Sequence, residues 1–127
     1  MTTLNQMTSP KSIAIVGASD NKNRIGGRPL SHMIEQNFEG TVYPVNPNRE
    51  KVQGLKSYPN VFELAEKPSI INFVVPPKTG FKITKELIEN DFDNFWYQPG
   101  AESKEISTLL INKNKSCIEF FLSKEKK

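Results

Sequence analysis

The chain has 127 residues, of which 24% are charged, and a formal net charge of +3. Its single cysteine, Cys117, excludes an internal disulfide, no apolar run approaches the roughly 20 residues that span a bilayer, and the first ten residues lack the apolar segment of a signal peptide. We therefore expect one cytoplasmic domain over residues 1–127 that binds neither a membrane nor nucleic acid, because much of the positive excess lies in residues 124–127.

The first predicted element is a strand that follows a flexible polar arm, residues 1–11. Ser12 to Ser19 is an apolar run, rich in β-branched residues, that ends at Gly17 and continues into small residues. Such an unbroken apolar run is typical of a strand buried on both faces of a parallel sheet. Gly17 and Ala18 let the loop backbone approach a ligand, and Ser19 adds a hydroxyl donor. If a helix follows, its N-terminal amides suit a phosphate, although any α/β domain needs a similar turn.

The segments that follow alternate between strand and helix patterns. A polar loop with two adjacent glycines spans residues 20–28, and apolar residues recur at helical spacing from Pro29 to a stop at Gly40. The apolar run before Pro76-Pro77 ends there, because proline cannot continue a central ladder. The other predicted strands are Thr41–Val45, Ile70–Val75, Phe95–Tyr97 and Cys117–Leu122, the other predicted helices are residues 61–67, 79–90 and 102–112, and residues 50–58 are expected to be irregular.

This alternation predicts an α/β fold, with a doubly wound parallel sheet of about five strands between two layers of helices. The expected strand order is third, second, first, fourth and fifth, so that the order reverses between the strands at residues 12–19 and 95–97. Ligands of such sheets bind outside the carboxyl ends of the strands at the reversal. The loops that meet there begin at Gly17, Asn46, Pro76 and Gln98.

The loops after the first two strands favour some nucleotides over others. A dinucleotide fingerprint calls for glycine where Ser19 stands and for an acidic residue after the second strand, where the chain reads Asn46-Pro47-Asn48-Arg49. Both differences count against NAD. Arg49 and Lys51 instead place positive charge where a ribose phosphate would lie, and both NADP and coenzyme A (CoA) carry such a phosphate. A solvated surface pair is the alternative interpretation of these two side chains.

Four motifs in this order and spacing resemble those of a known family. They are Gly17-Ala18-Ser19 with the downstream Arg24 and Gly26, then Pro44-Val45-Asn46-Pro47, Pro76-Pro77 and Gln98-Pro99-Gly100. The chain resembles the small stand-alone CoA-binding proteins with a Rossmann-like fold, which are similar to the amino-terminal domain of the succinate-CoA ligase alpha subunit. The resemblance runs from about Ser12 to the last predicted strand. Many relatives end that strand in an Asp-Arg-Cys-like motif, whereas this chain reads Ile118-Glu119-Phe120-Phe121-Leu122-Ser123.

The resemblance implies where the nucleotide would bind. In that family the loop after the first strand holds the CoA phosphates, the residues after the second strand meet the ribose phosphate, and the proline turn after the third strand borders the nucleotide. Carried over by position, the implied binding residues are Gly17, Ala18, Ser19 and Arg24, then Asn46, Pro47 and Lys51, then Val75, Pro76 and Pro77.

The sequence presents no catalytic constellation. The only histidine, His32, lies within the predicted helix that begins at Pro29, and the ligase's phosphohistidine belongs to a domain absent from this chain. Cys117 begins an apolar strand, where a buried structural thiol is expected. The acidic residues show no metal-like spacing. We therefore expect a protein that is not itself an enzyme and that holds no metal.

Three hypotheses for function remain open at this point. The first is a non-catalytic module that binds CoA or an acyl-CoA. The second is an NADP-binding redox protein, or an enzyme subunit whose protein partner supplies the catalytic residues. The third is a degenerate interaction domain that keeps the fold without the ligand. The missing acidic residue after the second strand disfavours NAD, and only binding data separate the first hypothesis from the third.

Overall fold

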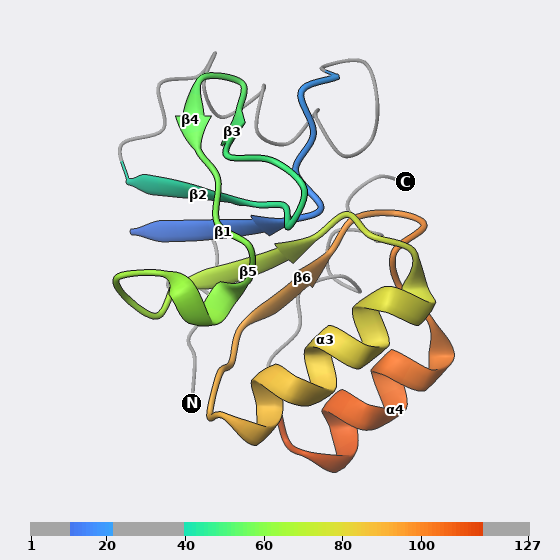
Figure 1. Cartoon of the computed structure of the whole chain (residues 1–127). Helices are drawn as coiled ribbons and strands as arrows, with labels where there is room; N and C mark the ends of the chain where they lie inside the picture. The colour runs from blue at the N-terminus through green and yellow to red at the C-terminus, as the bar shows by residue number, and fades with distance from the viewer. Residues whose placement is uncertain (1–10, 22–39, 116–127) are drawn as a thin grey trace.

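The computed structural model describes residues 11–21 and 40–115. Within them, four strands form a parallel sheet in the order β2-β1-β5-β6, and two helices lie side by side below it (Figure 1). The strands are β1 (Ser12–Val16), β2 (Thr41–Val45), β5 (Ile70–Phe73) and β6 (Phe95–Tyr97), and the helices are α3 (Pro77–Glu89) and α4 (Lys104–Asn112). The result is a Rossmann-like α/β fold, as the alternation of strand and helix patterns predicts.

The predicted order of the strands is wrong at β5. This strand pairs with β1, with Ile13 opposite Ile70, so β1 has β2 on one side and β5 on the other. The order therefore reverses between β1 and β5 rather than between β1 and the strand at residues 95–97. Pro44 explains this arrangement, because proline has no N–H and is tolerated on an edge strand, which β2 is among the described residues. β1 and β5, by contrast, are buried along their whole length.

The helices predicted at residues 79–90 and 102–112 are present, with ends that differ from the prediction by at most two residues. α3 begins at Pro77, whose fixed φ suits the first helical position, and it buries Gly80, Thr84 and Leu87 at helical spacing. α4 begins after Ser103, whose side chain accepts a hydrogen bond from the Ile106 amide. The predicted helix from Pro29 and the predicted strand Cys117–Leu122 lie outside the described residues. No helix in the described ranges is long and apolar enough to cross a membrane.

Two short segments differ from expectation. The helix predicted for residues 61–67 is a single 3-10 turn, Val61–Glu63, because the backbone becomes extended at Leu64 with ψ near 151°. Residues 50–58, expected to be irregular, contain an antiparallel hairpin of β3 (Lys51–Val52) and β4 (Leu55–Lys56). The residues between its strands, Gln53 and Gly54, both have positive φ, as a two-residue type I′ turn requires.

The core lies on both faces of the sheet. Between the sheet and the helices, the rings of Phe73 and Tyr97 stack with centroids 4.7 Å apart, and both side chains are buried. The opposite face carries a smaller cluster, whose buried members are Ile13, Ile15, Ala18, Val52 and Ile70. Because Val52 belongs to β3, this second cluster anchors the hairpin to the sheet.

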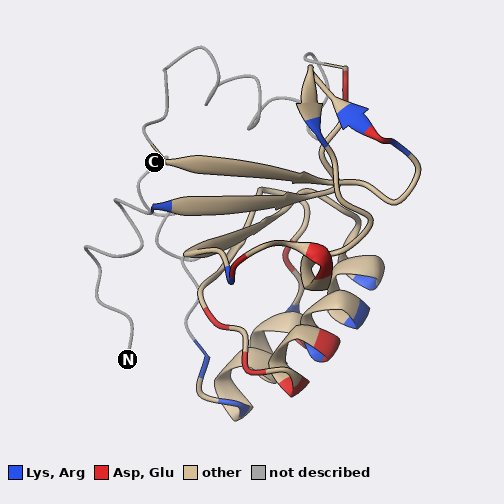
Figure 2. Cartoon of the chain, turned by 60° about the vertical axis from the view of Figure 1, so that its left-hand side comes forward, with Lys and Arg blue, Asp and Glu red and all other residues tan. Residues whose placement is uncertain are grey.

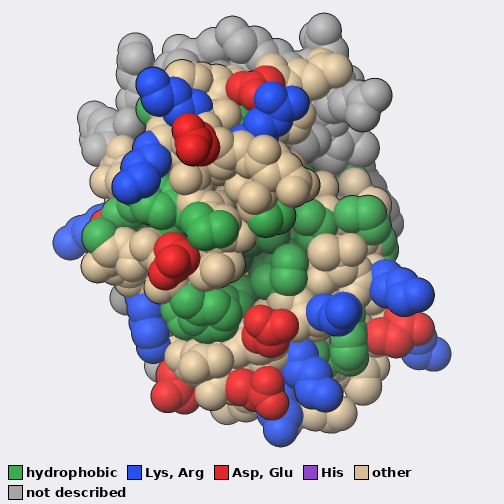
Figure 3. Space-filling model, viewed as in Figure 1, with side chains coloured by type: hydrophobic (Ala, Val, Ile, Leu, Met, Phe, Trp, Pro, Cys, Tyr) green, Lys and Arg blue, Asp and Glu red, His purple; other side chains and the backbone are tan. Residues whose placement is uncertain are grey.

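The charged residues are kept away from the sheet. Figure 2 shows Lys and Arg on the β3–β4 hairpin and charges of both signs along the helices, while the sheet strands are almost entirely uncharged. In the space-filling view, the charged groups of the hairpin lie above a band of hydrophobic side chains, and the charged groups of the helices lie below it (Figure 3). The hairpin therefore brings positive charge to the end of the molecule where β1 and β5 deliver their loops.

Candidate functional site

Strands β1, β2 and β5 end at the same level of the sheet, so the loops that follow them start side by side. The Gly17 amide donates to the Val45 carbonyl at 3.0 Å, and the Val74 amide donates to the Val16 carbonyl at 2.9 Å. The backbone pairing thus continues one residue past β1, at Gly17, toward β2 and one residue past β5, at Val74, toward β1. Since the strand order reverses between β1 and β5, the crevice expected to receive a ligand lies between the loops that begin at Gly17 and Val74.

Gly17 stands where two predicted site segments touch. Its φ is +95°, a conformation that side chains disfavour, and a Cβ atom there would lie 2.7 Å from Cγ1 of Val75 and 3.1 Å from Cγ2 of Val74. Only glycine therefore lets the loop after β1 pass this close to the loop after β5. The structure brings the predicted residues Gly17 and Val75 together.

Side-chain amides fix the orientation of the next two peptide groups. Asn46 Nδ2 donates to the Ala18 carbonyl at 3.0 Å, and Gln53 Nε2 donates to the Ser19 carbonyl at 2.9 Å. The peptides are trans, so the N–H on the far side of each peptide points the opposite way. These are the amides of Ser19 and Asp20, and neither finds an acceptor among residues 11–21 and 40–115. Two adjacent backbone donors are thereby directed away from the Asn46 and Gln53 side chains, as an anion site between the loops requires.

Asn46 is a positioning residue rather than a free donor. While its Nδ2 donates to the Ala18 carbonyl, its Oδ1 accepts from the Asn48 backbone amide at 2.8 Å, and its backbone amide donates to the Tyr58 carbonyl. Its side chain thereby joins the loop after β2 to the loop after β1. The Ser19 hydroxyl accepts from the Asn21 amide at 3.1 Å and keeps its own proton available to a further acceptor.

The hairpin carries Lys51 beside a second lysine. Lys51 lies opposite Lys56 in the antiparallel register, and both are exposed. Because the Ser57 amide donates to the Glu50 carbonyl, the two lysines form the adjacent non-hydrogen-bonded pair, in which side chains are closest. Lys56 Nζ also lies 5.1 Å from the centroid of the Tyr58 ring.

Arg49 faces an acidic residue of the loop after β1. Its Nη1 lies 3.9 Å from Asp20 Oδ2, with 63% and 47% of the two side chains exposed. Such an exposed pair contributes little to stability, on the order of 1 kcal/mol or less. Its consequence is electrostatic, since the Asp20 carboxylate offsets the charge of Arg49 and leaves Lys51 and Lys56 as the neighbouring cations on the hairpin.

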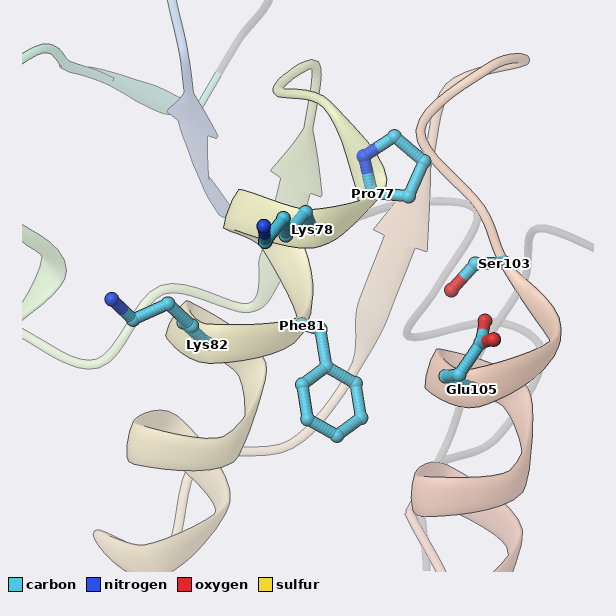
Figure 4. Close-up of a pocket in the computed structure, with 6 residues that line it drawn as sticks. All are labelled: Pro77, Lys78, Phe81, Lys82, Ser103 and Glu105. Carbon is cyan, nitrogen blue, oxygen red and sulfur yellow. The ribbon is translucent and has the colours of Figure 1, made fainter.

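The proline turn after β5 leads into α3. Pro76 precedes the helix, and its carbonyl accepts from the Gly80 amide at 2.9 Å. A hollow of about 480 Å³ lies beside this turn, between the first turns of α3 and α4 (Figure 4). Its lining residues are Pro77, Lys78, Phe81, Lys82, Ser103 and Glu105. Among the described residues, Pro77 belongs both to this hollow and to the predicted site, whereas none of residues 17–21 lines it.

The loop after β6 is anchored to β5. The Gln98 amide donates to the Phe73 carbonyl, and Gln98 Nε2 donates to Oδ1 of the buried Asn72 at 3.3 Å. Gly100 has φ +94°, and its amide donates to the Glu102 carboxylate. This loop follows a strand one place further from β1 than predicted, because β5 takes the position expected for β6.

The predicted site residues thus gather around the end of β1, with additions. Gly17, Ala18 and Ser19 contact the loops after β2 and β5 or the hairpin, Pro47 follows Asn46, and Arg24 lies outside the described residues. Sequence reasoning missed Asp20 and Gln53 as parts of this network. The Gln53-Gly54 pair was the available signal, because a glycine in a two-residue turn between short β-prone segments favours a hairpin.

Comparison with known proteins identifies the family. The family model described as a CoA binding domain matches residues 11–119. The chain belongs to the CoA binding domain family. Coenzyme A is the ligand to which this family and its ligase relatives point.

Curated relatives of this CoA binding domain are longer chains. The alpha subunit of acetate–CoA ligase (ADP-forming) I from Pyrococcus furiosus is 32% identical over 122 residues, covering 85% of this chain and 26% of that subunit. A trans-feruloyl-CoA synthase from an unknown prokaryotic organism is 43% identical over 63 residues, covering 50% of this chain and 9% of that protein. The chain thus spans at most 26% of the length of these two relatives.

Solved structures share the fold of the domain. A conserved hypothetical protein from Pyrococcus furiosus superposes with a TM-score of 0.77 at 43% identity, covering 84% of this chain and 90% of that chain. A dinucleotide-forming acetyl-coenzyme A synthetase from Candidatus Korarchaeum cryptofilum, in its apo form, has a TM-score of 0.72 at 25% identity, covering 87% of this chain and 25% of that one. Both a chain of similar size and a region of a much larger enzyme therefore resemble this CoA binding domain.

Proposed function

We propose that this CoA binding domain holds CoA or an acyl-CoA at the carboxyl ends of β1, β2 and β5 without catalysing a reaction itself. The single observation that carries this proposal is the loop after β1. Its Ala18 and Ser19 carbonyls are held by the side chains of Asn46 and Gln53, which directs the amides of Ser19 and Asp20 away from those two side chains. Such a pair of oriented backbone donors suits the diphosphate of a nucleotide.

The parts of the ligand are assigned by charge and position. The diphosphate lies at the amides of Ser19 and Asp20, where the Ser19 hydroxyl adds a donor and Arg24 adds the charge that the family resemblance implies. The ribose phosphate lies at Lys51 on β3. The turn through Val75, Pro76 and Pro77 borders the nucleotide, as the close approach of Val75 to Gly17 supports.

The same charges leave two other ligands to be compared with CoA. NADP also carries a ribose phosphate, so Lys51 does not by itself separate NADP from CoA. NAD lacks that phosphate, and the segment Asn46-Pro47-Asn48-Arg49 offers no carboxylate to its ribose hydroxyls. Membership in the CoA binding domain family favours CoA over NADP.

A second candidate function follows from the length of the relatives. The chain covers 26% of the alpha subunit of an acetate–CoA ligase. A chain of this kind supplies the CoA site to a protein partner that carries the remaining domains. Co-purification with such a partner, together with CoA-dependent ligase activity of the complex but not of the chain alone, supports this second function.

Isothermal titration calorimetry with CoA, dephospho-CoA, NADP and NAD tests the proposal. We expect CoA to bind most tightly. Lys51→Ala should weaken CoA about tenfold, roughly 1.4 kcal/mol, and dephospho-CoA less than twofold, because only CoA carries the ribose phosphate. Lys85→Ala removes one exposed lysine from α3 and is the matched control, which should leave both affinities unchanged.

Each other outcome has a definite meaning. Equal losses for CoA and dephospho-CoA in Lys51→Ala would remove Lys51 from the ribose-phosphate site. Binding of NADP alone would redirect the search to a redox partner. Absence of binding by all four nucleotides would refute the proposal and leave an interaction domain as the leading account.

A further inference from the structure

Gln53 joins the tip of the hairpin to two consecutive residues of the loop after β1. Its side-chain amide donates to the Ser19 carbonyl at 2.9 Å, and its backbone amide donates to Asp20 Oδ1 at 2.6 Å. Asp20 also faces Arg49 at 3.9 Å, just before the hairpin. We call these contacts of Asp20 and Gln53 the latch.

The latch is one of several attachments that hold the hairpin in place. The two strands of the hairpin have two residues each, and an isolated two-stranded hairpin is at most marginally stable in water. Its attachments include the buried Val52 side chain, the backbone hydrogen bonds of Tyr58 with Pro44 and Asn46 near its base, and the latch near its tip. Among these attachments, the latch is the one made of hydrogen bonds to the loop expected to bind the diphosphate.

A negative charge at Asp20 is unfavourable for binding phosphates at the neighbouring amides, so a structural role would explain why an acidic residue stands there. A carboxylate beside bound phosphates repels them, by roughly 1 kcal/mol at contact distance in water. In the structure this carboxylate accepts a hydrogen bond from the Gln53 backbone amide and faces the Arg49 guanidinium, so both of its oxygens have partners on the hairpin side. If Asp20 acted only through its charge, removing it would raise the affinity for every anionic ligand. If Asp20 acts through the latch, removing it should lower the affinity for the ligand that carries the ribose phosphate.

The specific loss concerns Lys51, which lies two positions before Gln53 in the hairpin. Lys51 and Lys56 are directly opposite each other, and like charges in such a pair are mutually unfavourable. An anionic group between them relieves this repulsion. Its distance from the amides of Ser19 and Asp20 is set by how the hairpin sits on the loop.

We propose that Asp20 and Gln53 are positioning residues that determine specificity for the ribose phosphate. By fastening the hairpin to the loop after β1, they hold Lys51 and Lys56 at a distance from the Ser19 and Asp20 amides that matches the separation of the ribose phosphate from the diphosphate in CoA. This inference rests on the proposed CoA binding. It adds that discrimination between CoA and dephospho-CoA depends on two residues that do not contact the ribose phosphate.

The test is the ratio of the dissociation constants of dephospho-CoA and CoA, measured by calorimetry in three variants. Asp20→Asn keeps an oxygen that accepts from the Gln53 backbone amide and removes the negative charge, so the ratio should stay within about twofold of the wild type. Asp20→Ala removes the acceptor, and Gln53→Gly removes the side-chain amide while suiting the positive φ of 49° at this turn. Both should lower the ratio at least about threefold, mainly by weakening CoA.

Controls separate the latch from charge and from folding. Glu50→Ala removes an exposed carboxylate beside the hairpin without touching the latch, and it should leave the ratio unchanged. Circular dichroism confirms that each variant folds, and hydrogen exchange should be faster for amides of residues 51–58 in Asp20→Ala than in Asp20→Asn.

The outcomes distinguish this inference from the proposed function. If wild-type protein does not bind CoA, the proposed function fails and this inference fails with it. If wild-type protein binds CoA but does not prefer it over dephospho-CoA, or if the folded Asp20→Ala and Gln53→Gly variants keep the wild-type ratio, only this inference is overturned. A ratio that falls equally in Asp20→Asn and Asp20→Ala also overturns it, because charge alone would then explain the loss.

Discussion

At Gly17 one hydrogen atom in place of a side chain determines how the loops of β1 and β5 meet. Glycine is favoured there for two separate reasons, the positive φ and the close packing. Another glycine of the chain has the first without the second. Gly54 also has positive φ, +83°, but a Cβ atom at that position would meet nothing within 4 Å. Comparing the two glycines therefore isolates the contribution of the close approach to Val75.

We predict different costs for alanine at these two positions. Gly54→Ala should lose about 1–2 kcal/mol of unfolding free energy from backbone strain alone. Gly17→Ala should lose roughly a further 1–3 kcal/mol, because its Cβ would overlap the Val75 side chain 2.7 Å away. Urea unfolding of both variants measures the difference. Equal losses would show that Val75 moves aside at no cost and that the approach is not tightly packed.

At the scale of elements, a buried hydrogen bond joins α3 to β6. Thr84 Oγ1 lies 2.6 Å from the Tyr97 hydroxyl, and both side chains are buried under the helix layer. Hydrophobic packing alone is not directional, so this bond helps to determine how the helix is placed against the strand.

Tyr97→Phe should destabilise the protein by about 1–3 kcal/mol, because it leaves the Thr84 hydroxyl buried without this partner. In the Tyr97→Phe variant, Thr84→Val should cost much less unfolding free energy than it does in the wild type, since the bond is already absent. Chemical denaturation of the wild type, both single variants and the double variant gives the coupling energy. Thr79→Val, at an exposed position of α3, is the control and should change stability by less than about 0.5 kcal/mol. Additive effects would contradict a direct bond.

At the scale of the whole molecule, proton binding is linked to folding. The Tyr43 hydroxyl donates to the Glu66 carboxylate, and this bond, with burial and the nearby negative charge, raises the pKa of Tyr43 from 10.0 to about 12. The folded state then holds the Tyr43 proton more tightly than the unfolded state does. The stability that results is complete below about pH 10 and is lost as the pH rises through about 12.

We therefore expect the unfolding free energy of the wild type to fall between about pH 10 and 12 more steeply than that of Tyr43→Phe. Urea unfolding of both proteins across this range measures the difference, in which the lysines that titrate at similar pH cancel. A constant difference between the two curves would show that the Glu66 contact does not persist in solution.

We also expect a single cooperative transition for the chain, because we propose that residues 1–127 form one domain.

Much of the fold and part of the site follow from local patterns. The unbroken apolar run before Gly17 predicts a buried strand, and Pro44, Pro76 and Pro77 mark where an edge strand or a helix start is tolerated. These patterns lie within windows of a few residues, in which backbone propensity and side-chain spacing act directly. They suffice for the α/β class, for α3 and α4, and for the small-residue loop after β1.

Contacts between distant residues were settled only by the folded chain. The position of β5 beside β1 depends on which strands bury both faces, and the latch joins Asp20 to Gln53 across 33 residues. Neither residue is unusual in its own neighbourhood, so no local pattern marks their contact. Local propensity selects an element, whereas packing between elements selects its neighbours, and the arrangement of the candidate CoA site depends on those neighbours.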